Sequence, residues 1–298
     1  MTRAVLSAIR TVLRRLSPAD GEVSRTELWT PVSQESTDRK VSAPVPWLCA
    51  VTDIGKSRRS NQDDYFLSKD CTLWVVADGV GGHAAGEVAS MLTIQAIAEV
   101  MDSAGTSEER VLGDPRGTTS ASVSMSSGES LMRAFAEAQE RVLGRSRKDP
   151  RCQEMGSTVI AGLLRGDALH ICHAGDTRGY HFSQGQLRCL TNDHSFVWNL
   201  VRAGLLTPDQ ARVHPHRGTI TQAIGMHGGV RPDVTSVNLA QGDRVLLCSD
   251  GLWEALADSE IEMILGQNGS MLEVASTLVE RANASSGRDN ITAVLYKH

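Results

Sequence analysis

The chain has 298 residues, 41% of them hydrophobic, which is enough for one large domain or two small ones with an ordinary core. Aromatic residues are only 4%, and 30 Lys and Arg stand against 35 Asp and Glu, so the formal charge is -5. This composition argues against a disordered chain and against nucleic acid as a partner, because phosphate-backbone binders need a basic excess and stacking aromatics.

Residues 1–17 carry apolar side chains at helical spacing with arginines on one flank, which predicts a basic amphipathic helix. Three roles stay open for it: docking on a partner, lying on an anionic membrane surface, or packing on its own domain. Residues 18–46 are rich in proline, serine, threonine and charge, a composition typical of a flexible linker. We therefore expect an N-terminal extension over 1–45 and a folded domain over 46–298.

The folded domain is predicted to alternate short strands with a few long helices. The expected strands are 48–52, 72–77, 158–164, 169–173, 244–248 and 291–296. The expected helices are 86–101, 130–143, 196–203 and 271–283. Many strands with few helices favour an α+β sandwich, and residues 103–129, rich in Ser, Thr and Gly, predict a mobile insert.

Six cysteines are scattered without a Cys-x-x-Cys pair, which predicts reduced core residues rather than disulfides or a zinc ribbon. Arg10, Arg14 and Arg15 interrupt the apolar residues near the N-terminus, so no uncharged stretch there has the length of a signal peptide. No later apolar run approaches the roughly 20 residues of a membrane span. We expect a cytoplasmic protein with no transmembrane segment.

Acidic residues recur beside turn-forming residues at the ends of predicted strands. Asp78 and Asp250 each end a strand and precede glycine, and Asp289 precedes Asn290 at the start of another strand. If these strand ends converge, the carboxylates lie close together, and like charges at that range stay ionised only when cations offset them. The alternative is plain turn chemistry, since Asp-Gly is a common turn dipeptide.

The polar segment 53–64 lies between two apolar strands and adds two candidate groups. Arg58 offers a planar fork of donors suited to phosphate, and Asp63 would face a metal held by Asp78. A solvated basic turn is the alternative for Arg58. All the candidate ligands are oxygen donors, which favours Mg²⁺ or Mn²⁺ over Zn²⁺ and predicts a hard-metal site directed at phosphate.

Seven short strings follow one another in the order found in one known family. They are Gly55-x-x-Arg58-x-x-Asn61-Gln62-Asp63, Val76-Ala77-Asp78-Gly79-Val80-Gly81-Gly82-His83, Gly156-Ser157-Thr158, Gly175-Asp176-Thr177-Arg178, Asp193-His194-Ser195, Ser249-Asp250-Gly251-Leu252-Trp253 and Asp289-Asn290-Ile291-Thr292. In these strings the chain resembles the metal-dependent type 2C (PPM) serine/threonine protein phosphatases, in their bacterial branch. The resemblance covers about 46–298 and implies a four-layer α-β-β-α sandwich of two antiparallel sheets flanked by helices.

The resemblance implies a site for two Mn²⁺ or Mg²⁺ ions. Asp78 would bridge both ions, the Gly79 carbonyl would bind one, and Asp250 and Asp289 would bind the other. Asp63 would act mainly through metal-bound water. A water bridging two divalent ions loses a proton near neutrality, which yields a hydroxide that attacks phosphorus without a covalent enzyme intermediate.

Other family positions carry less direct roles. Asp176 matches the place of a third, weaker ion, although the family more often has serine where this chain has Thr177. Arg58 would bind the phosphoryl oxygens of the substrate. His83 is a candidate general acid or, alternatively, a structural histidine at a helix start. Residues 191–232 match the family's flap, where we expect substrate choice to reside.

The function implied is hydrolysis of phosphoserine and phosphothreonine in proteins, reversing a cytoplasmic Ser/Thr kinase. Two alternatives remain at this point. One is a regulatory docking module of the same fold, which missing metal aspartates would have favoured. The other is a phosphoesterase for small molecules, which the same metal chemistry would support.

Overall fold

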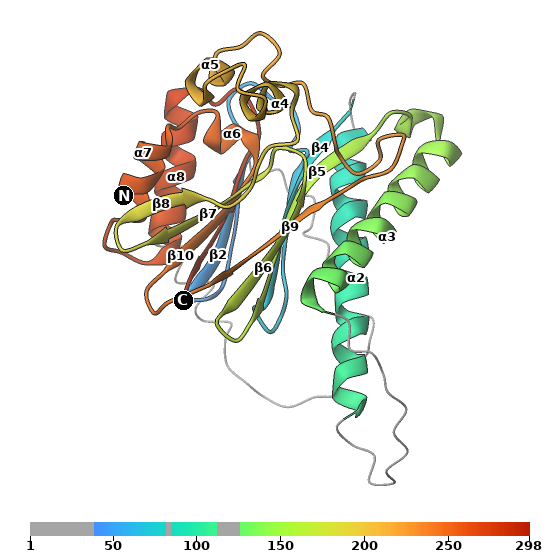
Figure 1. Cartoon of the computed structure of the whole chain (residues 1–298), viewed down its shortest axis with the longest axis horizontal. Helices are drawn as coiled ribbons and strands as arrows, with labels where there is room; N and C mark the ends of the chain where they lie inside the picture. The colour runs from blue at the N-terminus through green and yellow to red at the C-terminus, as the bar shows by residue number, and fades with distance from the viewer. Residues whose placement is uncertain (1–38, 82–84, 112–125) are drawn as a thin grey trace. The chain divides into compact units, whose positions relative to one another are not determined.

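The computed structural model describes residues 39–81, 85–111 and 126–298 of the chain (Figure 1). These residues belong to one compact unit, Asp38–His298. The predicted N-terminal helix, His83 and residues 112–125 of the predicted insert lie outside the described part. None of the described helices is long and apolar enough to cross a bilayer.

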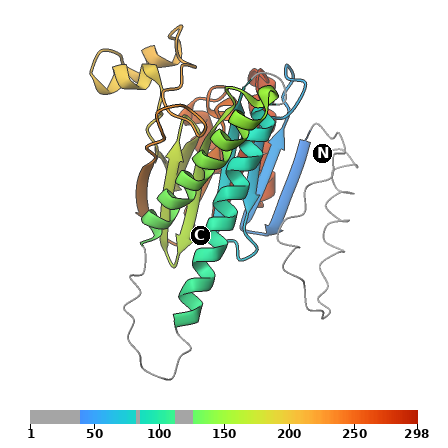
Figure 2. The same ribbon diagram turned by 90° about the vertical axis from the view of Figure 1, so that its right-hand side faces the viewer.

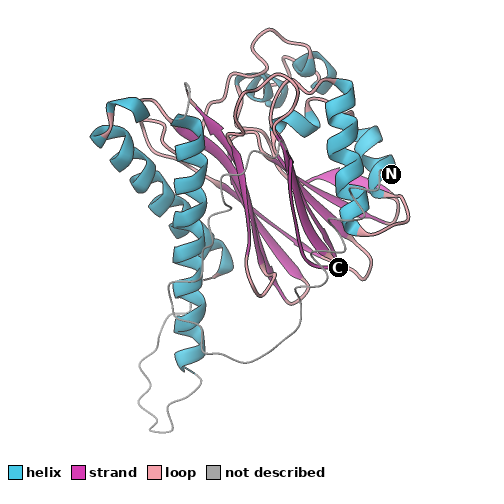
Figure 3. Ribbon diagram, turned by 180° about the vertical axis from the view of Figure 1, so that it is seen from behind, coloured by secondary structure: helices cyan, strands magenta, loops and turns pink. Residues whose placement is uncertain are grey.

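Two antiparallel sheets form the centre of the described unit, with the strand orders β1-β2-β11-β10-β7-β8 and β3-β4-β5-β6-β9. The first sheet consists of β1 (Arg39–Val45), β2 (Leu48–Asp53), β7 (Arg178–Ser183), β8 (Gln186–Cys189), β10 (Arg244–Cys248) and β11 (Ile291–Lys297). The second sheet consists of β3 (Asp63–Leu67), β4 (Leu73–Val80), β5 (Gly156–Arg165), β6 (Ala168–Ala174) and β9 (Asp233–Asn238). Figure 3 shows the two sheets face to face with helices on both outer sides.

The helices are α2 (Ala85–Val111), α3 (Ser127–Lys148), α4 (Phe196–Arg202), α5 (Pro208–Arg212), α6 (Asp250–Trp253), α7 (Asp258–Leu265) and α8 (Met271–Ser285), with a short 3-10 turn η1 (Pro150–Cys152). The helices α2 and α3 cover the five-stranded sheet, seen from their side in Figure 2. The helices α6, α7 and α8 cover the six-stranded sheet. The predicted α-β-β-α sandwich is therefore confirmed.

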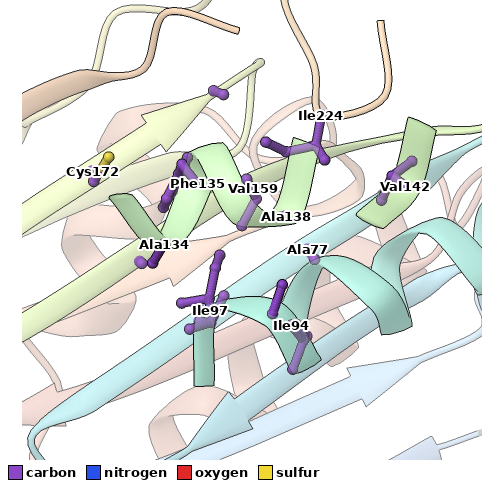
Figure 4. Close-up of a cluster of buried hydrophobic side chains, with 14 of the residues drawn as sticks. Ala77, Ile94, Ile97, Ala134, Phe135, Ala138, Val142, Val159, Cys172 and Ile224 are labelled. Atoms are coloured by element: carbon purple, nitrogen blue, oxygen red, sulfur yellow. The ribbon is translucent and has the colours of Figure 1, made fainter. Parts of the chain in front are cut away.

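The outer face of the five-stranded sheet is sealed by an amphipathic pair of helices. A capping box between Ser126 and Glu129 fixes the start of α3. From there Phe135 and its helical neighbours point toward Ile94 and Ile97 of α2 and toward the sheet, as Figure 4 shows. This packing holds α2 against the strand that carries Asp78.

Strand alternation sets which side chains reach the space between the sheets. In β4, Val75 and Ala77 pack under the helices, whereas Trp74 and Val76 lie in the core between the sheets. Asp78 continues the second series by one step. The two-residue period that builds the core therefore places this carboxylate on the inner side, at the end of the strand.

Two predicted boundaries are wrong. Residues 39–45, expected in the linker, form β1, which pairs with β2 at the sheet edge, so the folded domain begins before residue 46. The edge position leaves Val41 half exposed, so this strand lacks the strong apolar signal of a central one. Residues 103–111, expected in the insert, extend α2. Ser103 is compatible with that helix because its hydroxyl donates to the Glu99 and Val100 carbonyls.

Candidate active site

Four of the predicted site carboxylates come from strand ends at one edge of the sandwich. Asp63 and Asp78 are direct partners in the β3–β4 ladder. Asp250 opens α6 just after β10, and Asp289 lies two residues before β11, the strand that pairs with β10. The structure therefore brings together residues that are far apart in the sequence.

These carboxylates act on one another electrostatically. Loss of solvation, followed by the charges of Asp63, Asp250, Asp176 and Asp289, raises the pKa of Asp78 well above its ordinary value. Burial and the neighbouring carboxylates likewise raise the pKa of Asp250. A cluster of this kind stays ionised only where cations offset the repulsion.

Asp63 belongs to one sheet but is held by hydroxyl groups of the other. Ser249 Oγ and Thr292 Oγ1 each donate a hydrogen bond of 2.7 Å to Asp63 Oδ2. Burial raises the pKa of Asp63 to about 6, although these two hydrogen bonds act to lower it. Oδ1 of Asp63 and Oδ1 of Asp250 are buried without a hydrogen-bond partner among the described residues. Unpartnered carboxylate oxygens in an all-oxygen set fit a hard divalent cation.

A chain of hydrogen bonds continues behind Asp63. Asn61 Nδ2 donates to Thr52 Oγ1 at 2.8 Å, and the hydroxyl oxygens of Thr52 and Thr292 lie 2.7 Å apart. Because Thr292 gives its proton to Asp63, Thr52 is the donor in that pair. Both threonines are buried, so this chain fixes the orientation of the Asp63 carboxylate.

The glycine after Asp78 and after Asp250 is required by a close approach of backbones. The first pair lies within β4 and the second opens α6, so the plain-turn alternative is wrong for both. A Cβ at Gly79 would lie 2.1 Å from a carbonyl oxygen at the start of α2. A Cβ at Gly251 would lie 2.0 Å from the carbonyl oxygen of Asn290. The two glycines thus allow neighbouring elements to close around the carboxylates.

Arg58 stands at the mouth of this cluster. Its Nη2 donates to Asp289 Oδ2 at 2.5 Å, and this hydrogen bond raises the pKa of the guanidinium. Arg58, Asp250 and Asp289 line a cavity of about 600 Å³. A half-exposed guanidinium anchored there is suited to phosphoryl oxygens, whereas a freely solvated turn would leave it unpaired.

The predicted flap, residues 191–232, contributes part of the cavity lining. Val197 and Trp198 of α4 and Ala211 of α5 line it together with the carboxylate edge. Figure 1 shows α4 and α5 at the same end of the sheets as α6. Residues of this segment therefore line the same cavity as Arg58 and Asp250.

Asp176 is buried beside the same cluster, in the loop between β6 and β7. Burial, and next the charge of Asp193, raise the pKa of Asp176 to about 7. Its carbonyl oxygen accepts a 2.9 Å hydrogen bond from Trp253 Nε1. His83, the candidate general acid, lies outside the described residues.

Three residues with strong contacts near the site received no role from the sequence. Arg178, Asp193 and Trp253 form one buried group, although each belongs to one of the seven strings. Their place in those strings was the one sequence feature that could have indicated a role for them. Contact between them depends on the pairing of strands that are distant in the sequence, which no string reveals.

Comparison with known proteins gives the same family throughout. The family described as Protein phosphatase 2C matches residues 55–295. The serine/threonine phosphatase stp of Listeria monocytogenes is 33% identical over 248 residues, 82% of this chain and 92% of that protein. The serine/threonine protein phosphatase PstP of Mycobacterium tuberculosis is 37% identical over 246 residues, 83% of this chain but 44% of that longer protein.

Solved structures agree with these sequence relatives. The crystal structure of the M. tuberculosis phosphatase has a TM-score of 0.71 at 34% identity, covering 87% of this chain and 98% of that one. The catalytic domain of PstP in complex with two manganese ions has a TM-score of 0.69 at 33% identity, covering 87% and 97%. Sequence, fold and site lead to one conclusion: the chain belongs to the protein phosphatase 2C family.

Proposed function

We propose that this protein is a metal-dependent protein serine/threonine phosphatase that hydrolyses phosphoserine and phosphothreonine. The observation that carries this proposal is the convergence of several carboxylates on one edge of the sandwich, with Arg58 at the mouth. Within the described part of the chain, buried oxygens of Asp63 and Asp250 lack hydrogen-bond partners, which fits a site for divalent cations. Family membership supports the reaction, and the relatives are named as phosphatases of serine and threonine.

Each carboxylate has a proposed role. Asp78 would be a ligand of both ions, the Gly79 carbonyl would hold one, and Asp250 and Asp289 would hold the other. Asp63 would act mainly through water on the ions, and Asp176 would help to hold a third, weaker ion. Mn²⁺ or Mg²⁺ suits this all-oxygen set, and one structural relative contains two manganese ions. When bound, the ions acidify a bridging water and offset the charge of the phosphate.

The remaining side chains orient the substrate and supply a proton. Arg58, steadied by Asp289, presents its donors to the phosphoryl oxygens and offsets charge as it develops in the transition state. His83 is our candidate for the proton donor to the departing serine or threonine oxygen. Flap residues line the cavity, where they would contact the peptide around the phosphorylated residue.

The proposal extends to the cellular setting. Phosphorylated proteins are the substrates, a cytoplasmic Ser/Thr kinase is the opposing enzyme, and the N-terminal extension docks on a partner or an anionic membrane surface. Six unpaired cysteines favour a reducing compartment such as the cytoplasm.

The decisive test is hydrolysis of a phosphothreonine peptide and of a small aryl phosphate by the purified full chain, with Mn²⁺, with Mg²⁺ and with a chelator. We expect turnover that requires metal and favours the peptide. Asp250→Asn should abolish turnover while the protein stays folded, because it removes a metal ligand and no core volume. Asp167→Asn, at an exposed carboxylate in the β5–β6 turn, is the matched control and should leave turnover unchanged.

Each contrary result has a meaning. Turnover in the chelator, or full activity of Asp250→Asn, contradicts the metal assignment. No turnover by folded protein under any condition favours the regulatory docking module. A clear preference for the aryl phosphate favours a phosphoesterase for small molecules.

A further inference from the structure

A buried ion pair that the proposed chemistry does not use joins β7 to the first residues of the flap. Arg178, the first residue of β7, donates from Nε to Asp193 Oδ1 at 2.8 Å and from Nη2 to Asp193 Oδ2 at 2.7 Å. The side chains are 11% and 7% exposed. A bidentate pair of this kind has one preferred geometry.

All three nitrogens of the Arg178 guanidinium are engaged. Nη1 donates to the hydroxyl of Tyr180 at 3.2 Å, and the group lies 3.7 Å from the centre of the Trp253 ring. The guanidinium is therefore not free to bind phosphate, although it borders the cavity. Arg178 can therefore affect substrate binding only by positioning the residues that its guanidinium contacts.

Asp193 directly precedes the point where the flap closes on itself. We call this point the flap neck, formed by residues 194–196 beside 219–221. Phe196 N–H donates to the Thr219 carbonyl at 2.8 Å, and Thr221 N–H donates to the His194 carbonyl at 2.7 Å. In the sequence, α4 and α5 lie between the two sides of the neck, so the neck contributes to their orientation.

A second attachment lies next to the first. The backbone N–H of His194 donates to the Gly175 carbonyl at 2.9 Å, and His194 Nδ1 accepts from the Gly175 N–H at 3.2 Å. The proton of the neutral ring therefore lies on Nε2, 3.3 Å from Asp233 Oδ2. His173, stacked on His194, donates from Nε2 to the Asn192 carbonyl at 3.0 Å. The hydrogen bonds of the two histidines fasten the neck.

A buried ion pair is poor evidence of stabilisation, because desolvation of the two charges offsets their attraction. What the pair contributes is a fixed position of Asp193 relative to β7. Val197, Trp198 and Ala211 form the flap wall and line the same cavity as Arg58 and Asp250, so the neck bears on where this wall lies relative to the carboxylate edge. A small aryl phosphate needs only the carboxylate edge, whereas a peptide also extends along the flap wall.

We propose that Arg178 is a positioning residue for substrate choice: its pair with Asp193 fixes the flap neck, and thereby the wall that receives the peptide chain of a phosphoprotein. The inference rests on the proposed phosphatase function. It assigns discrimination between peptide and small phosphoester to a residue whose guanidinium is engaged by Asp193 and Tyr180.

The test compares Arg178→Met, which keeps a long side chain against Trp253, with Arg178→Lys, which keeps the charge but lacks the fork. For both variants we expect KM for a phosphothreonine peptide to rise about tenfold, while kcat/KM for an aryl phosphate changes by less than about threefold. Hydrogen exchange should accelerate at the amides of Phe196 and Thr221. Exchange in the central strand β5 should stay as in the wild type.

A double variant separates positioning from instability. Arg178→Met combined with Asp193→Leu leaves no unpaired charge, so stability should recover, yet the KM defect for the peptide should persist. Equal loss with both substrates, an unchanged KM for the peptide, or exchange that rises equally in β5 would overturn the inference. Failure of the wild type on both substrates would instead refute the proposed function.

Discussion

At the scale of the residue, Asp63 shows how the orientation and charge of a candidate site carboxylate depend on the hydroxyl groups that donate to it. Its Oδ2 is satisfied by hydroxyl donors, and Oδ1 is left unpartnered among the described residues. Because the hydrogen bond from Thr292 lowers the pKa of Asp63 against the effect of burial, it favours the ionised carboxylate that a cation needs. On the proposed assignment of Asp63, Thr292 would contribute to metal affinity without contacting the metal.

Thr292→Val tests this contribution, since valine keeps the shape of threonine and removes the donor. We expect metal binding to weaken by about 1.5 to 3 kcal/mol, the range for a hydrogen bond to a charged group, or roughly tenfold or more in affinity. Titration calorimetry with Mn²⁺ measures it directly. Thr292→Ser, which retains the hydroxyl, should bind as the wild type does, and equal affinity of the valine variant would contradict the argument.

At the scale of the element, the sequence predicted best what repeats along a strand or helix. The apolar run of β4 and the periodicity of α3 predicted those elements, and alternation along β4 explains why Asp78 faces inward. The strand β1 was missed because an edge strand buries too little to show a clear pattern. The end of α2 was misplaced because serine and glycine suggest a loop, whereas hydrogen bonds to helix carbonyls accommodate Ser103.

The position of β1 leads to a prediction about truncation. Removing residues 1–37 should leave the thermal midpoint of unfolding unchanged, since the compact unit begins at Asp38. Removing residues 1–45 should lower it by several °C, because the cut takes away the ladder to β2 and the ion pair between Arg39 and Glu280. Differential scanning calorimetry distinguishes the two cases, and equal midpoints would mean that β1 adds nothing to the sheet.

At the scale of the whole molecule, the seven strings predicted that the carboxylates lie close together. They did not predict which hydrogen bonds and ion pairs hold the surrounding residues in place. Each string is local, whereas the pair of Arg178 with Asp193 and the bonds to Asp63 join segments separated by 15 to more than 200 residues. Such contacts depend on strand order and register, which are known only once both sheets are assembled.

A site built from mutually repelling carboxylates should also weaken the metal-free fold. Chelation should lower the thermal midpoint, and Mn²⁺ should restore it in proportion to the logarithm of its concentration above the dissociation constant. Without metal, Asp250→Asn should be more stable than the wild type by about 1 to 2 kcal/mol, because one of the repelling charges is gone. Urea unfolding in chelator measures this difference, and a less stable variant would argue against repulsion as the cause.

The hydrogen bonds of Ser249 and Thr292 to Asp63 connect the two sheets. The geometry of the site therefore depends on how the sheets are aligned. Protein interiors are close-packed and transmit strain. A substitution at Trp74 or Ile160, in the core between the sheets, that lets one sheet slide over the other would change the spacing of the carboxylates at the edge. The affinity for metal would then report a shift in the sandwich too small to alter any strand or helix.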